Sequence, residues 1–140
     1  MKPTIFVAVA GLGLACADCS SGSAATATFP DAPFISTMTD SGNIRVELRT
    51  SPQPPARGTI DAQLVVTNAA DGTPRDDLAL SILPWMPAMN HGAIHPTITP
   101  QGDGKYLITE LDLYMPGHWQ LRTTISGPVT DSVAPAFDIP

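Results

Sequence analysis

Residues 58–68 read GTIDAQLVVTN and are followed by a turn at Ala70-Asp71-Gly72. Apolar side chains fall at every second position of this stretch, at Ile60, Ala62, Leu64 and Val66. A period of two gives an extended chain one apolar face, which is the pattern of a strand that covers a core on one side. The stretch therefore predicts a half-buried β-strand.

Short segments of the same kind recur on both sides of this strand. Prolines number 15 and glycines 11, and no segment keeps helical apolar spacing over several turns. We expect six further strands, over residues 44–48, 78–82 (ended by Pro84), 94–99, 105–113, 118–125 and 134–139. About seven short strands predict an all-β, immunoglobulin-like antiparallel β-sandwich, and a small closed barrel is the alternative.

The first residues have the pattern of an export signal. Lys2 precedes an uncharged apolar run from Thr4 to Ala15, shorter than the roughly 20 residues that span a membrane. Residues 1–16 are therefore predicted to be a signal peptide. Leu14-Ala15-Cys16 resembles a bacterial lipoprotein signal, in which Cys16 is lipidated, whereas Ala15-Cys16-Ala17 also fits simple cleavage.

The rest of the chain divides into a tether and one domain. Residues 17–33 are mostly small and polar, which is typical of a flexible tether, and residues 34–140 are long enough for one domain with its own core. Cys16 and Cys19 form a C-x-x-C, but at the edge of the leader a redox motif would have no folded scaffold. We expect the domain to lie in the periplasm or on the outer face of a membrane, held by a lipid anchor.

The charge balance limits the kinds of molecule that the protein could bind. The formal net charge is −6 and no basic cluster occurs, so the electrostatic footprint of a nucleic-acid binder is missing. The sequence also has no nucleophile elbow and no phosphate-cradling glycine loop. We therefore expect a binding protein rather than an enzyme, with a cation as the natural partner.

Methionines and histidines gather in two short segments. Residues 85–95 read WMPAMNHGAIH and residues 114–119 read YMPGHW, and together they contain all three histidines and three of the five methionines. The candidate ligands are Met86, Met89, His91, His95, Met115 and His118.

A hairpin between the two segments would bring them together. If Asp103-Gly104 is its turn, Gly102 pairs with Lys105, His91 faces Pro116, and Met89 faces His118. If the turn is Gly102-Asp103, His91 faces Tyr114, next to Met115. In both registers the two groups meet at the open end of the hairpin.

Thioether sulfur with imidazole nitrogen indicates copper. Soft thioethers favour Cu(I), and imidazole accepts either oxidation state, so we expect Cu(I) in preference to Cu(II). Zinc would recruit Cys or carboxylate ligands. The competing interpretations are that the methionines fill gaps at one end of the core and that His95 is a solvated side chain.

The order of these motifs resembles the YtkA-like domain, which is related to the FixH-like proteins. The matching pieces are Pro54/Pro55 to Gly58, Asp71-Gly72, Met86-Pro87-Ala88-Met89-x-His91, Gly104-x-Tyr106 and Met115-Pro116-Gly117-x-Trp119. The resemblance implies an exported sandwich in a family linked to copper handling and oxidase assembly. It also implies Met86, Met89, His91 and Met115 as ligands, whereas His118 rests on the hairpin argument.

Two functions follow as expectations. The first is an extracytoplasmic carrier or buffer of copper that exchanges the ion with a membrane-bound donor or acceptor. The second is an interaction module whose Met- and Trp-rich end docks on a membrane protein or an oxidase assembly factor, because flexible Met side chains suit adaptable binding surfaces.

Overall fold

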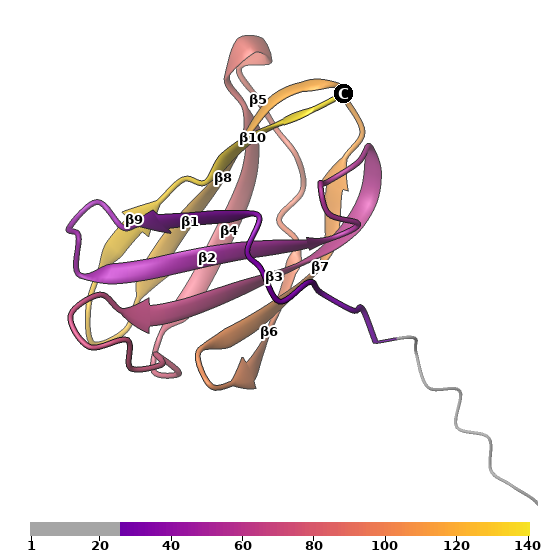
Figure 1. Cartoon of the computed structure of the whole chain (residues 1–140). Coiled ribbons are helices and arrows are strands. Elements are labelled where there is room, and N and C mark those ends of the chain that lie inside the picture. Colours follow the sequence, from indigo (N-terminus) through magenta and orange to yellow (C-terminus); the bar gives the residue numbers. More distant parts are fainter. Residues whose placement is uncertain (1–25) are drawn as a thin grey trace, which may run out of the picture.

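The computed structural model describes residues 26–140, which form two layers of strands (Figure 1). The predictions for the signal peptide, for Cys16 and Cys19, and for the first part of the tether lie outside these residues. Within the described part of the chain, no helix is long and apolar enough to cross a membrane.

Each layer is an antiparallel sheet. Sheet A has the order β1 (Ile35–Met38), β2 (Ile44–Ser51), β3 (Gly58–Asn68), β7 (Lys105–Leu113), β6 (Thr97–Gly102). Sheet B has the order β10 (Ala136–Ile139), β8 (Gly117–Ser126), β4 (Ala79–Met86), β5 (His91–Gly92), and β9 (Asp131–Val133) also pairs with β8. A single 3₁₀ turn among the described residues, η1 (Pro87–Met89), connects β4 to β5. The predicted β-sandwich is confirmed, in place of the closed barrel.

The number of strands was underestimated, because the described chain has ten rather than seven. The three additional strands, β1, β5 and β9, contain only two to four residues each. Such segments are too short to show a period of two, and their pairing with longer neighbours defines them. They lie along the sides of β2, β4 and β8.

The core fills the space between the inner faces of the two sheets. Alternation decides which side chains enter it, since β2 buries Ile44, Val46 and Leu48 while β3 buries the residues expected from its period of two. From the other sheet, β8 contributes Trp119 and Leu121. The predicted apolar faces of these strands are therefore the faces that pack.

Two predicted strand boundaries were wrong in the region that carries the Met and His residues. Strand β4 continues through Pro84 to Met86, because Pro84 lies where β4 needs no ladder bond from its nitrogen. Strand β6 begins at Thr97 rather than at residue 94. The residues before it belong to β5 and to the segment that crosses from sheet B to sheet A.

The hairpin register also differs from both expectations. Gly102 pairs with Lys105, as the first register requires, but an irregularity between Pro100 and Gly102 shifts the ladder, which ends at Thr97 opposite Thr109. His91 pairs instead with Met86 of β4. The interpretation that this hairpin faces His91 toward residues 114–118 is therefore wrong.

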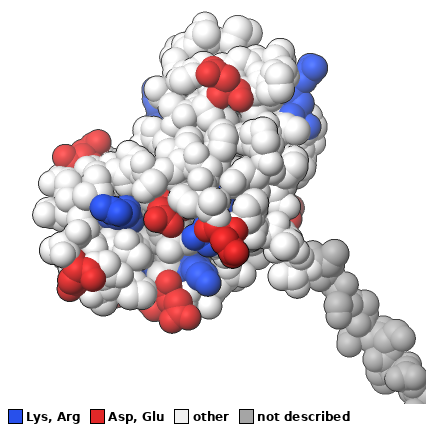
Figure 2. Space-filling model, in the orientation of Figure 1, with Lys and Arg blue, Asp and Glu red and all other residues white. Residues whose placement is uncertain are grey.

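On the face shown in Figure 2, the Lys and Arg side chains lie among Asp and Glu and form no continuous basic area.

Candidate functional site

The two Met- and His-containing segments meet because β4 and β8 are neighbours in sheet B. Trp85 of β4 lies opposite Gln120 of β8, so the segment after β4 and the turn before β8 emerge at the same end of the sandwich. The route is thus the β4–β8 pairing and not the β6–β7 hairpin.

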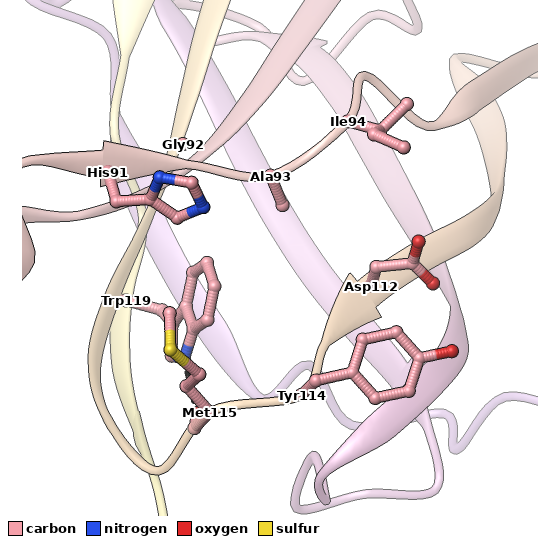
Figure 3. A pocket seen from close by; sticks show the side chains of 8 residues that line it. All are labelled: His91, Gly92, Ala93, Ile94, Asp112, Tyr114, Met115 and Trp119. Carbon is pink, nitrogen blue, oxygen red and sulfur yellow. Dashed lines mark hydrogen bonds between the residues drawn. The ribbon is translucent and has the colours of Figure 1, made fainter.

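A pocket of about 400 Å³ opens at this end. Its lining comes from β5 and the segment after it, from the end of β7, and from the β7–β8 turn and β8, and consists of His91, Gly92, Ala93, Ile94, Asp112, Tyr114, Met115 and Trp119. Figure 3 shows the imidazole of His91, the sulfur of Met115 and the indole of Trp119 gathered on one side of the pocket. Asp112 and Tyr114 lie on the other side, with their polar ends directed away from His91.

Met86 lies behind this group in the core. It is 3% exposed, and as the cross-strand partner of His91 it projects from the same face of sheet B. Its Cε lies 3.6 Å from the position that a β-carbon on Gly117 would occupy. The thioether therefore packs against the turn that follows Met115 and is adjacent to the pocket, although it is not part of its lining.

Met89 occupies a different environment. It is the last residue of η1 and is 61% exposed, and the following residue, Asn90, has the left-handed backbone (φ 48°) that turns the chain into β5. Met89 does not line the pocket.

The structure separates the other two histidines from His91. His118 is exposed, and its Nδ1 lies 3.0 Å from Oδ1 of Asp138, its cross-strand neighbour on β10. Since the next residue, Trp119, is buried, His118 projects from the outer face of sheet B.

His95 lines a second pocket, with Leu80, Ser81, Ile82, Pro96 and Ile98. Its Nδ1 lies 2.7 Å from the carbonyl oxygen of Ile82, and because a carbonyl only accepts, Nδ1 carries the proton. The six candidates thus fall into a central group of Met86, His91 and Met115, with Met89, His95 and His118 outside it.

The pocket also contains residues that the sequence analysis did not propose as site residues. In the sequence, Trp119 appeared only as the end of the Met115-Pro116-Gly117-x-Trp119 motif, and Asp112 and Tyr114 carried no signal of a site. Oγ1 of Thr59 lies 2.6 Å from Oδ1 of Asp112 and 2.6 Å from the Tyr114 hydroxyl. These bonds hold both side chains against β3, so the polar side of the pocket is already hydrogen-bonded.

The donor set determines what the site can hold. Among residues 26–140, no three His, Cys, Asp or Glu side chains lie close enough together to hold a metal ion. Coordination at this end would therefore depend on thioether sulfur in addition to the imidazole of His91. Such a set fits a soft ion of low coordination number and does not fit zinc or calcium.

The chain was compared with known families, curated proteins and solved structures. No curated protein and no solved structure gave a significant match. Residues 38–124, more than half of the chain, match the YtkA-like family, and this range includes both Met- and His-containing segments. The chain belongs to the YtkA-like family.

Proposed function

We propose that this protein is an extracytoplasmic copper carrier or buffer, which holds Cu(I) between His91 and Met115. The observation that carries the proposal is that an imidazole and a thioether, from segments far apart in the sequence, line the same side of one pocket. Met86 offers a further sulfur, because it lies beside Gly117 and is the cross-strand partner of His91. Copper enters as the protein's cargo, to be exchanged with a membrane-bound donor or acceptor.

The chemistry of the donors supports Cu(I) over Cu(II). Thioether sulfur is a soft, neutral ligand that needs no deprotonation, and neutral imidazole completes a set of low charge. Cu(II) would favour additional nitrogen or oxygen ligands. His118 and His95 could supply nitrogen, but both lie outside the pocket. The predicted export signal and lipid anchor at Cys16 would place this site where free thiols become oxidised.

The proposal is tested by titrating residues 26–140 with Cu(I) against a competing chelator. The Met86→Leu/Met115→Leu double variant removes both sulfurs while nearly conserving side-chain volume, so the core should remain packed. We expect this variant and His91→Ala each to bind Cu(I) at least tenfold more weakly than the wild type.

Two controls come from the same chain. Met38→Leu removes an exposed methionine from β1, and His95→Ala removes a histidine from the other pocket. Both should bind Cu(I) with the affinity of the wild type. Equal affinity in the wild type and the double variant would show that the central group is not the copper site.

A second function is favoured by the rim of the pocket. Ile94 is 78% exposed and Tyr114 is 65% exposed, and large apolar side chains so exposed beside a pocket are typical of an interaction site. We propose as the alternative that this end docks on a membrane protein. The Ile94→Ser/Tyr114→Ser variant would then lose co-purification with its partner from membranes, while its Cu(I) affinity stays unchanged.

A further inference from the structure

We infer that Trp119 is itself part of the copper site, and that the π face of its indole closes the site and favours a monovalent soft cation. This inference rests on the proposed function and names a contact that neither histidine nor methionine provides. The role assigned to Trp119 depends on the π face of its ring and not only on the volume that the ring fills.

Trp119 lies in the wall of the pocket, next to both proposed ligands. Its indole lines the pocket together with His91 and Met115, and Figure 3 shows the three side chains on the same side. Trp119 is 2% exposed, and its Nε1–H donates to the Met115 carbonyl oxygen at 2.9 Å. The backbone that carries one candidate ligand is thus tied directly to the indole.

The burial of Trp119 is shared with a neighbouring aromatic residue. Phe137 of β10 is the cross-strand partner of Trp119 on β8, and both residues are buried. The indole is therefore enclosed in the core, and its Nε1 edge is fixed by the Met115 carbonyl oxygen. An aromatic ring fixed in this way presents a defined surface to the pocket.

The other tryptophan provides an internal comparison. Trp85 lies on the outer face of sheet B, where the Arg122 guanidinium sits 4.4 Å from its ring centroid. Trp119 lies on the inner face, and the eight residues that line its pocket include no Lys or Arg. One ring already has a cation over its face, and the other borders a pocket that also contains the His91 imidazole and the Met115 thioether.

Cation–π attraction then explains what the indole would add. A cation within about 6 Å of a tryptophan ring is attracted by its quadrupole, most strongly when water is excluded. The ring offers no lone pair, so it cannot complete the shell of an ion that needs four hard ligands. Together with one imidazole and the thioethers, it favours Cu(I) or Ag(I) over Zn²⁺.

The experiment uses Ag(I), a redox-inert substitute for Cu(I), and the Trp85→Phe variant, which leaves Trp119 as the single tryptophan. Ag(I) affinity is measured by competition with a chelator, independently of any tryptophan signal. The near-ultraviolet difference spectrum is recorded in parallel. We expect a red-shifted indole band that saturates together with the binding curve and is lost in His91→Ala.

Selectivity is measured with Trp119→Leu, which removes the π face, and Trp119→Phe, which keeps an aromatic ring. We expect Trp119→Leu to lower the ratio of Ag(I) to Zn²⁺ affinity roughly tenfold and Trp119→Phe to lower it less. The Arg122→Gln variant, which alters only the outer face, should leave the ratio unchanged.

The outcomes separate the two proposals. Tight Ag(I) binding by competition without an indole band would overturn the role of Trp119 and leave the copper site intact. If neither the wild type nor any variant binds Ag(I), both the copper site and the role of Trp119 are overturned. If Trp119→Leu fails to fold, the difference spectrum of the single-tryptophan protein still decides the question.

Discussion

Tyr106 shows how one side chain can hold a loop against the core. It is buried on β7, and its hydroxyl lies 2.8 Å from the Arg75 carbonyl oxygen and 3.2 Å from that of Leu78. Burial is the main cause that raises the pKa of this hydroxyl above its usual value, so it remains a donor at neutral pH. The segment that leads into β4 is thereby fixed to sheet A.

Replacing Tyr106 by Phe should lower the free energy of unfolding by about 1–3 kcal/mol, because it leaves the Arg75 and Leu78 carbonyls without this donor. Urea unfolding would measure the difference. Tyr114→Phe is the matched control, since Tyr114 is exposed and its hydroxyl is hydrogen-bonded to the Thr59 hydroxyl. A loss as large in the control as in Tyr106→Phe would contradict this assignment.

At the same scale, the sequence identifies the candidate ligand residues better than it predicts their burial and contacts. The clustering of Met and His is visible in the sequence, and His91 and Met115 do line one pocket. Burial of Met86 follows the alternation of β4, which was expected to end at Pro84, and exposure of Met89 depends on η1, a turn of three residues. The position of His118 is fixed by pairing between β8 and β10.

At the scale of elements, β7 contains the feature that the period of two does not predict. Tyr106 and Ile108 face the core, but so do Leu111 and Leu113, and the change of phase requires one extra residue. The register against β3 shifts between Ile60 and Ala62, and Glu110 has a left-handed backbone (φ 60°). This β-bulge lies just before the end of β7 that borders the pocket.

Glu110→Gly should be more stable than Glu110→Ala by roughly 1 kcal/mol, because glycine adopts a positive φ without the steric cost of a β-carbon. Both variants lose the hydrogen bond from the Thr97 hydroxyl, which is 2.8 Å long, so their difference isolates the backbone. Thermal unfolding of the pair would measure it. An alanine variant as stable as the glycine variant would show that the bulge relaxes.

The elements that were predicted are those with a long apolar period, such as β2 and β3. Strand β5 could not be predicted, because its two residues are held by pairing with Trp85 and Met86 rather than by their own pattern. Gly92 permits this pairing, since a β-carbon there would lie 3.1 Å from the Trp85 ring. The predicted hairpin contact between His91 and residues 114–118 was wrong because residues 91 and 92 form β5 in sheet B. They do not continue the β6–β7 hairpin of sheet A.

At the scale of the whole molecule, a polar corner joins the two sheets. The turn after β1 reaches β9, where the backbone N–H of Asp40 donates to the Ser132 carbonyl oxygen at 2.9 Å and the Ser41 hydroxyl donates to Asp131. Desolvation, the largest single influence, pushes the pKa of Asp131 upward. Hydrogen bonds from Ser41, Thr39 and Ser132 together outweigh it and lower the pKa from 3.8 to about 2.

A carboxylate whose pKa is lower in the folded state stabilises the fold above its unfolded pKa and loses this contribution as the pH falls through the folded value. Thermal stability should therefore decrease between about pH 5 and pH 2. Asp131→Asn should flatten this part of the profile, whereas Asp31→Asn, in the exposed segment before β1, should not. Parallel profiles for wild type and Asp131→Asn would exclude this corner as a source of acid sensitivity.

The contact between His95 and Ile82 has a consequence for how separate molecules meet. Within residues 26–140, the ladder on this side of β4 comprises only Trp85 and Met86, and the Pro84 carbonyl accepts from the Ala93 N–H, so the strand before Pro84 presents a free edge. Free edges are templates on which a second chain can add a strand and begin to aggregate. The His95 ring occupies the Ile82 carbonyl, and Pro84 offers no donor. Together they protect this edge against intermolecular strand addition.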